Sequence, residues 1–261
     1  MPTNNIRTLV RIFKNNFLRI TQHVPQCNKY IEAEAGAYWD NSKEVKSVRD
    51  MSHWKGEGRF ADEEFWERIG KSHLAMVREM QRMLDSTDKI TSMIEWGPGG
   101  GANAVKFATE VERIYGVDIS RSNLDECQLQ LQKINFDGFN KIHFPIDQPE
   151  KCFEVIEEKV DLFLSTAVYQ HFPSKAYGRN ITAIAYRLLN ENGLALIQIR
   201  YEGGRNIFFT KRRNYRKNFI TFTSYPIHEF WSMASEIGFK PLAVRLKPST
   251  NYAYFFLYKP N

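Results

Sequence analysis

Four of the five residues from Gly97 to Gly101 are glycine, and they directly follow an apolar run at residues 91–96. Glycine contributes no side-chain packing and costs backbone entropy. Its presence here therefore indicates a tight turn and a backbone that another group can approach closely. A helix that begins after such a turn presents free N–H groups to a ligand. Asp118 lies 21 positions beyond Gly97, where a carboxylate can accept hydrogen bonds from both hydroxyls of a ribose. The spacing therefore predicts a nucleoside site.

Alternating strands and helices must position these residues. We expect strands over residues 91–96, 113–120, 141–147, 160–168 and 193–201, and helices over 102–111, 121–134, 150–159, 174–189 and 227–239. The end of the chain, 241–246 and 252–259, reads as two paired strands. Such alternation indicates a parallel sheet covered by helices on both faces, with ligands at the carboxyl ends of the strands. The glycine-rich loop lies at such an end.

The ligand is better described as a cationic nucleoside than as a dinucleotide. Gly97, Gly99 and Ala102 formally satisfy the loose dinucleotide fingerprint. However, Glu95 precedes the loop, where it would repel a pyrophosphate and favour a cation. The chain also closes with a strand pair, where a second mononucleotide-binding half would be expected.

These residues resemble the motifs of class I S-adenosylmethionine-dependent methyltransferases. The pattern from Glu95 through Gly97 and Gly99 to Gly101 is similar to their first motif, and "YGVDIS" to their second-strand motif. "VDLFLSTAVYQHFP" is similar to the fourth-strand motif, "LNENGLALIQI" to the approach to the fifth strand, and "ASEIGFKPL" to the closing region. The resemblance covers residues 90–259. It implies an α/β, Rossmann-like, doubly wound seven-stranded sheet of order 3-2-1-4-5-7-6.

The resemblance also implies S-adenosylmethionine as cofactor and assigns residues to it. The loop glycines would surround the methionine portion, and Glu95 would face its ammonium or the sulfonium side. Asp118 would hold the ribose, and Ile119 would lie against the adenine. The full set of predicted cofactor residues is Glu95, Gly97, Gly99, Gly101, Asp118, Ile119, Asp147 and Ser165. Of these, Asp147 would meet the adenine amino group.

His171, just past the fourth predicted strand, is the candidate catalytic residue. Methyl transfer to a hydroxyl can require a general base, although a histidine in this turn can instead simply bond backbone. Tyr169 and Gln170 are expected to shape the acceptor pocket. We expect no metal, because Ser165 and Thr166 stand where a catechol-type magnesium site would need carboxylates.

Residues 1–89 form the predicted N-terminal helical extension, and residues 90–261 the methyltransferase core. The aromatic-rich stretch at 38–74, including His53 and Trp54, could cover the cofactor as a lid, or pack a helix onto the core. Residues 5–20 predict a basic amphipathic helix that docks on the core or a partner chain, or touches an anionic membrane surface.

The net charge of +6 is concentrated between Arg200 and Lys217. Because aromatic residues interrupt this basic run, it predicts a site for a small anionic acceptor at Arg205, Arg212 and Arg213. The segment "SHWKGEGRF" is similar to enzymes of polysaccharide and secondary-metabolite pathways, which favours a glycan or natural-product precursor as acceptor of the methyl group on an O or N atom.

Alternatives are an RNA or protein methyltransferase that uses residues 205–217, and a non-catalytic nucleotide-binding module. Nucleic acid is disfavoured, because the remainder of the chain has no net charge. The three scattered cysteines fit a reducing cytoplasm. The oligomeric state cannot be predicted from these patterns.

Overall fold

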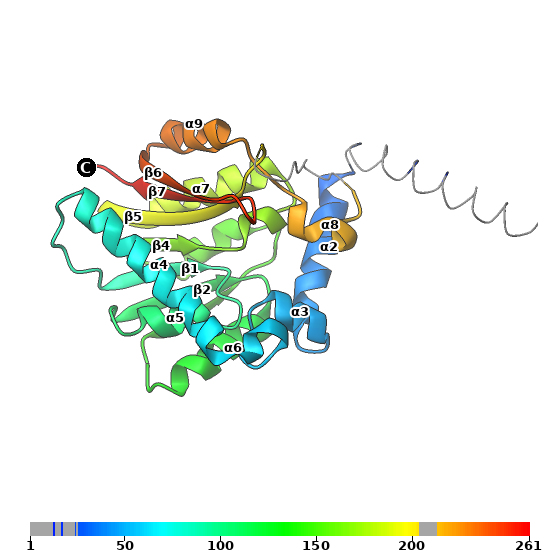
Figure 1. Ribbon diagram of the computed structural model, residues 1–261, viewed down its shortest axis with the longest axis horizontal. Helices are drawn as coiled ribbons and strands as arrows, with labels where there is room; N and C mark the ends of the chain where they lie inside the picture. Colours follow the sequence, from blue (N-terminus) through cyan, green and yellow to red (C-terminus); the bar gives the residue numbers. More distant parts are fainter. Residues whose placement is uncertain (1–12, 14–16, 18–23, 25, 204–212) are drawn as a thin grey trace, which may run out of the picture.

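A seven-stranded sheet of order β3-β2-β1-β4-β5-β7-β6 forms the centre of the protein (Figure 1). The computed structural model describes residues 13, 17, 24, 26–203 and 213–261. Strands β1 to β5 run parallel, and β7 lies antiparallel between β5 and β6. The strands are β1 (Ser92–Trp96), β2 (Arg113–Asp118), β3 (Phe139–His143), β4 (Val160–Ser165), β5 (Leu189–Arg200), β6 (Lys240–Lys247) and β7 (Tyr252–Tyr258). The predicted fold and strand order are confirmed.

Helices cover both faces of the sheet (Figure 1). One face packs against α4 (Glu63–Met83), α5 (Ala102–Phe107) and α6 (Arg121–Gln132), and the other against α7 (Lys175–Leu188) and α9 (Ile227–Ile237). Neighbouring strand residues point to opposite faces, so Met93 packs in the first layer and Ile94 in the second. Three other α-helices of the described residues, α2 (Asn28–Trp39), α3 (Lys46–Met51) and α8 (Tyr215–Asn218), lie together beside the sheet.

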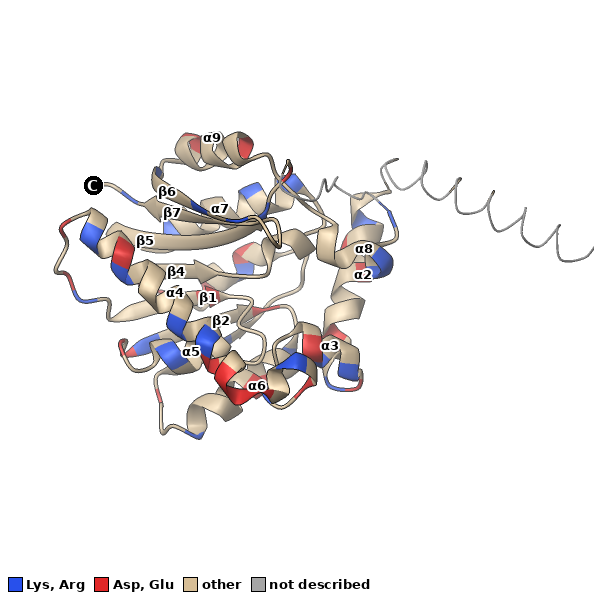
Figure 2. Cartoon of the chain, in the orientation of Figure 1, with Lys and Arg blue, Asp and Glu red and all other residues tan. Residues whose placement is uncertain are grey.

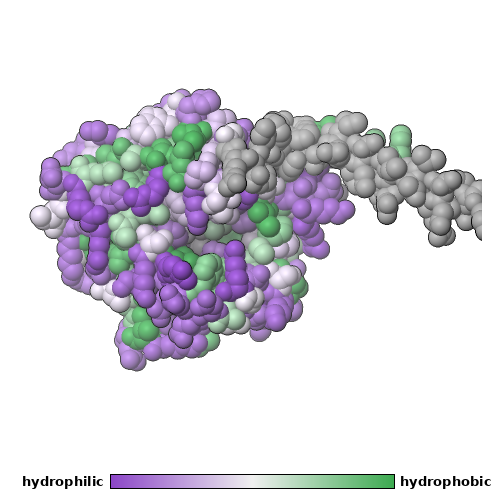
Figure 3. Space-filling model, in the orientation of Figure 1, coloured by the Kyte–Doolittle hydropathy of each residue, from purple (hydrophilic) through white to green (hydrophobic). Residues whose placement is uncertain are grey.

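Helix α4 is part of the core. Its first turn is capped by the Asp62 carboxylate, which accepts a hydrogen bond from the Phe65 backbone N–H at 3.1 Å. Its apolar side joins the cluster over the sheet, while the face seen in Figure 3 is largely hydrophilic. Gly70 brings it so close to α5 that a Cβ there would lie 2.6 Å from the Ala102 carbonyl oxygen. The division predicted at residue 89 therefore does not coincide with a break in packing.

Several predicted boundaries shift in the structure: the helix predicted over 102–111 ends at Phe107, the strand predicted over 160–168 ends at Ser165, and the strand predicted over 193–201 begins at Leu189. Two predicted elements differ further. The third strand spans Phe139–His143 rather than 141–147, because Pro145 offers no N–H to a ladder. The segment predicted as a helix over 150–159 forms only a 3₁₀ helix, Pro149–Glu154. Among the described residues, no helix is long and apolar enough to cross a membrane. Most of the amphipathic helix predicted at residues 5–20 lies outside the described residues.

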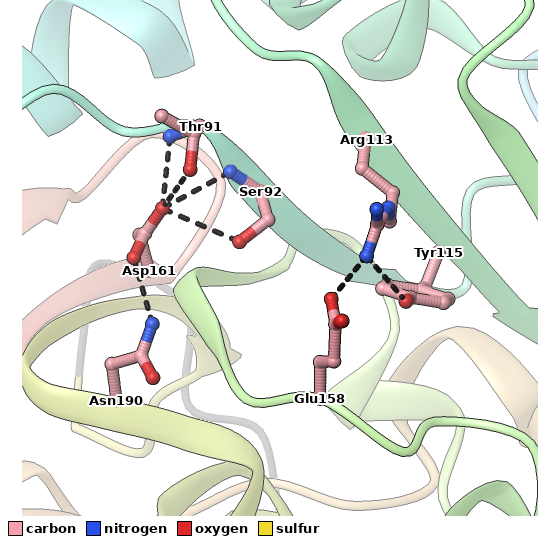
Figure 4. A network of polar contacts seen from close by, with 7 residues as sticks. All are labelled: Thr91, Ser92, Arg113, Tyr115, Glu158, Asp161 and Asn190. Carbon is pink, nitrogen blue, oxygen red and sulfur yellow. Dashed lines mark hydrogen bonds and ion pairs between the residues drawn. The ribbon is translucent and has the colours of Figure 1, made fainter.

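Asp161 at the start of β4 ties three segments together at the edge of the sheet opposite the carboxyl ends (Figure 4). One oxygen accepts hydrogen bonds from the backbone N–H and hydroxyl groups of Thr91 and Ser92, at 2.8–3.3 Å. The other accepts one from Asn190 Nδ2 at 2.8 Å. Partial burial acts to raise its pKa, but these hydrogen bonds outweigh that effect and hold the pKa of Asp161 below its usual value.

We expect Asp161→Ala to lower the free energy of unfolding by about 1–3 kcal/mol at pH 7. Because the folded-state pKa is lowered, this stabilisation is present above the unfolded pKa of about 3.9 and is lost as the pH falls through the folded value. Urea unfolding at pH 7 and pH 3 measures both. Asp137→Ala, at an exposed position, is the control. An equal loss in both variants would show that the Asp161 hydrogen bonds contribute nothing.

Candidate active site

A pocket lies at the carboxyl ends of β1, β2 and β4, where the strand order reverses between β1 and β4. The pocket and its open mouth together hold about 690 Å³ of empty space. It is lined by Trp39, Met51, Ser52, His53, Trp96, Gly97, Val117, Asp118, Ile119, Asn123, Phe144, Ile146, Thr166, Ala167, Val168, His171, Phe172, Tyr177 and Tyr215. The N-terminal segment therefore contributes to its wall, as the lid interpretation expects.

The glycine-rich loop, residues 97–101, follows β1 and contacts the pocket at Gly97. Gly97 has φ +77°, and a Cβ there would lie 2.4 Å from Val168 Cγ2. At Gly99 and Gly100, a Cβ would lie 2.3 Å from the Ser52 carbonyl oxygen and 2.6 Å from that of His53. The Gly100 N–H also donates to the Ser52 carbonyl at 2.7 Å. Residues 51–54, which we name the strap, thus rest on the loop.

Only one of the three predicted loop glycines, Gly97, lines the pocket. We expected Gly99 and Gly101 to admit a ligand, but the structure gives each another neighbour. Gly99 admits the strap, and Gly101 begins α5 at φ +84° beside Cys127. As predicted, another group comes close to the backbone at these glycines. That group belongs to the protein itself and not to a ligand.

Asp118 lines the pocket at the end of β2 and is 8% exposed. Its Oδ1 accepts a hydrogen bond from the Ser120 N–H at 2.9 Å. Burial raises the pKa of Asp118 to about 6. The apolar side chains of Ile119, Phe144 and Ile146 line the pocket with it. A carboxylate among apolar side chains can bind the ribose and base of a nucleoside.

Glu95 is buried and does not itself line the pocket, although the next residue, Trp96, does. Its Oε1 accepts a hydrogen bond from Asn103 Nδ2 at 2.8 Å, whereas Oε2 is buried with no hydrogen-bond partner among the described residues. Burial raises the pKa of Glu95 to about 8. At pH 7 the buried carboxyl group is therefore largely protonated, and a cationic ligand group beside it would favour its ionised form. This site therefore fits a ligand that carries an ammonium or sulfonium group.

His171 lines the pocket from the 3₁₀ turn that follows β4 (Tyr169–His171). Its Nδ1 lies 2.8 Å from the Phe219 carbonyl oxygen, which can only accept, so we place the ring hydrogen on Nδ1. Nε2 then carries a lone pair, and Gln170 Nε2 donates to it at 3.2 Å. Burial lowers the pKa of His171 to about 4, so the ring is neutral at pH 7. The ring thus has the backbone bond that we weighed as a structural role, and a basic nitrogen at the pocket.

Comparison with known proteins agrees with this geometry. Residues 94–197 match the family model described as a methyltransferase domain. Residues 94–197 therefore form a methyltransferase domain that uses S-adenosylmethionine, and the sheet has the strand order expected of the class I enzymes. No curated protein matches the sequence at a significant level.

Solved structures share the fold of this methyltransferase at low sequence identity. The CcbJ methyltransferase of Streptomyces caelestis has a TM-score of 0.53 at 13% identity, covering 70% of this chain and 94% of its own. The N-methyltransferase NodS of Bradyrhizobium japonicum, solved with S-adenosylhomocysteine, has 0.51 at 11%, covering 70% and 85%. An S-adenosylmethionine-dependent methyltransferase of Clostridium acetobutylicum has 0.52 at 10%, covering 66% and 85%.

Besides Glu95, Gly99, Gly101 and the predicted basic residues, four further predicted site residues do not line the pocket. Asp147 is exposed, although its neighbour Ile146 is in the wall. The Ser165 hydroxyl bonds the Trp96 carbonyl at 3.1 Å and so ties β4 to β1. Tyr169 is buried in the core, with its hydroxyl 3.0 Å from Thr182 Oγ1, and Gln170 contacts His171 instead of the pocket. Ser165, Tyr169 and Gln170 therefore support the elements around the pocket and do not form its surface.

Several lining residues of the methyltransferase were missed by sequence reasoning. Trp39 Nε1 donates to the Tyr215 hydroxyl at 2.9 Å, and that hydroxyl donates to the His171 carbonyl at 2.6 Å. This bridge joins α2, α8 and the turn after β4. Tyr177, Asn123 and Thr166 are the other polar side chains we had not assigned. The only sequence signal for Trp39 was its place in the aromatic-rich stretch, which also favoured plain packing.

No described Lys or Arg of the basic run lines the pocket, although Tyr215 of the same segment does. Arg205 and Arg212 lie outside the described residues, and Arg213 does not line the wall. Of the other described basic residues of this run, Arg216 and Lys217 lie in α8, where Figure 2 shows them in blue, and Arg200 ends β5. Within the part of the chain that the structure describes, no group of three His, Cys, Asp or Glu side chains could hold a metal ion.

Proposed function

We propose that this methyltransferase transfers a methyl group from S-adenosylmethionine to an O or N atom of a small molecule, with His171 as general base. The observation that carries the proposal is the pocket itself: Asp118 and His171 face one space that Trp39 and the strap help to enclose. A concave pocket with a largely apolar wall and a few polar groups is typical of small-molecule sites. A nucleic-acid backbone would call for cations, and no described lining residue is Lys or Arg.

Each residue has a proposed role. Asp118 accepts hydrogen bonds from the ribose, Ile119 lies against the adenine, and Glu95 offers Oε2 to the ammonium. The bound cofactor supplies a methyl group already activated by its sulfonium. Trp39 and the strap exclude water, and His171 Nε2 accepts the proton that the acceptor loses.

The acceptor class extends this proposal. The basic run between Arg200 and Lys217 and the segment 52–60 favour an anionic glycan or natural-product precursor. Steep loss of RNA binding with rising salt, measured with the intact enzyme, would instead favour the RNA alternative.

Thermal unfolding with added ligands tests the proposed cofactor site. S-adenosylhomocysteine at about 100 times its Kd should stabilise the protein by about 2.7 kcal/mol, because it binds only the folded state. For a chain of this size that raises Tm by roughly 5–10 °C. NAD at the same concentration serves as the control and should leave Tm unchanged. Stabilisation by NAD alone would contradict the proposal.

A further inference from the structure

A chain of buried polar side chains leads from α4 to Glu95. His73 on α4 has its Nδ1 2.7 Å from Oδ1 of Asn103 on α5. Asn103 Nδ2 then donates to Glu95 Oε1 at 2.8 Å and to Thr166 Oγ1 at 3.0 Å. All four side chains are at most 7% exposed. Of the four, only Thr166 lines the pocket, so His73 lies behind the site and not in it.

The orientation of the Asn103 amide decides what this chain does. Only its NH₂ group can donate to the Glu95 carboxylate, and its oxygen would repel that carboxylate if the amide turned over. Asn103 Oδ1 can only accept, so the His73 Nδ1 must carry the hydrogen. Burial lowers the pKa of His73 to about 4, so the ring is a neutral donor at pH 7. The hydrogen bond that His73 donates to Asn103 Oδ1 thus holds the Asn103 amide with its NH₂ group toward Glu95.

The same orientation leaves one carboxylate oxygen free for a ligand. Asn103 occupies Oε1 of Glu95, and Oε2 has no partner among the described residues. Burial raises the pKa of Glu95 to about 8, and the hydrogen bond from Asn103 acts to lower it. If the amide turned over, Oε1 would lose that donor and the pKa of Glu95 would rise further, so ionising Glu95 for a cationic group would cost more free energy. A neutral carboxyl attracts an ammonium group far less than a carboxylate does.

We propose that His73 is a positioning residue for cofactor binding: it locks the Asn103 amide so that Glu95 keeps Oε2 for the ammonium of the cofactor. This inference rests on the proposed function, in which Glu95 binds that group. It assigns to α4, in the predicted extension, an effect on a ligand that it does not touch.

Two ligands that differ in one part test the inference. S-adenosylhomocysteine carries the ammonium, whereas methylthioadenosine keeps the nucleoside and sulfur and lacks the amino-acid portion. We expect His73→Phe, which keeps a ring but cannot donate, to weaken S-adenosylhomocysteine binding about 5- to 20-fold. Its affinity for methylthioadenosine should stay within about twofold of the wild type. Isothermal titration calorimetry measures both.

Three controls make the outcome decisive. His73→Asn restores an N–H near the place of Nδ1 and should recover most of the affinity. Met80→Leu, on the buried side of the same helix, should change neither ligand. In an Asn103→Leu background, His73→Phe should have no further effect, because the two residues act as one unit.

Equal weakening of both ligands by His73→Phe, or full affinity for S-adenosylhomocysteine, would overturn the inference. If the wild type bound neither ligand, the proposed function would fail instead. That result differs from a failure of His73 alone, in which the wild type binds both.

Discussion

Replacing His171 by alanine is expected to lower kcat about 10²–10⁴-fold while cofactor affinity stays intact. The imidazole is neutral, and its Nδ1 is fixed by the Phe219 carbonyl, so Nε2 is the nitrogen that can take the acceptor proton once the Gln170 amide that donates to it moves away. Since burial lowers the pKa of His171 to about 4, a base in this setting stays active as the pH falls well below 6.5. The pH profile of kcat should therefore lack a limb near that value.

Three measurements separate catalysis from structure at this residue. Turnover, S-adenosylhomocysteine affinity and Tm are compared for His171→Ala and for His228→Ala, a control at an exposed histidine on α9. Normal turnover with a lowered Tm would mean that the bond to Phe219 is the whole role of His171. In that case His53, the other histidine in the pocket wall, becomes the residue to replace next.

Asp118→Ala should weaken S-adenosylhomocysteine binding by about 1.5–3 kcal/mol, or roughly 10- to 150-fold. The loss reflects hydrogen bonds between a carboxylate and the ribose that are no longer made. Burial raises the pKa of Asp118 to about 6, so the carboxylate is ionised above that value and protonated below it. Wild-type affinity should therefore decrease as the pH falls below about 6, and the variant should lose this step.

The matched control is Asp147→Ala. Both carboxylates were predicted to bind the cofactor, but only Asp118 lines the pocket, while Asp147 is exposed. Calorimetry should show no change for Asp147→Ala. An unchanged affinity in a folded Asp118 variant would place the ribose elsewhere.

The sheet was predictable because alternating strands and helices leave few topologies open, and the resemblance supplied the order. Asp118 was predictable for the same reason. It ends the strand that follows the glycine-rich loop and its helix, and the carboxyl ends of parallel strands lie at the same edge of the sheet. Asp147 itself does not line the pocket, whereas its neighbour Ile146 is in the wall. Strand ends cannot be fixed to a single residue by pattern alone.

Other features depend on contacts between distant segments. Trp39 and Tyr215 are 176 positions apart, and no local pattern pairs them. The glycines at 99 and 100 predict that some backbone comes close, but not that it belongs to Ser52 and His53. Likewise, His73 sits on an amphipathic helix face where an ordinary core histidine would be expected, and only its contact with Asn103 distinguishes it.

The packing of α4 also limits how this chain can be divided. A fragment starting at residue 90 would contain all of the residues that match the family model, 94–197. Yet Met93, Leu162 and Leu196 share one buried cluster with α4 residues such as Val77 and Met80. Without that helix, a row of large aliphatic side chains would meet water and promote aggregation. The part of the chain that looks like a methyltransferase therefore depends, for its solubility, on a helix that carries no such likeness.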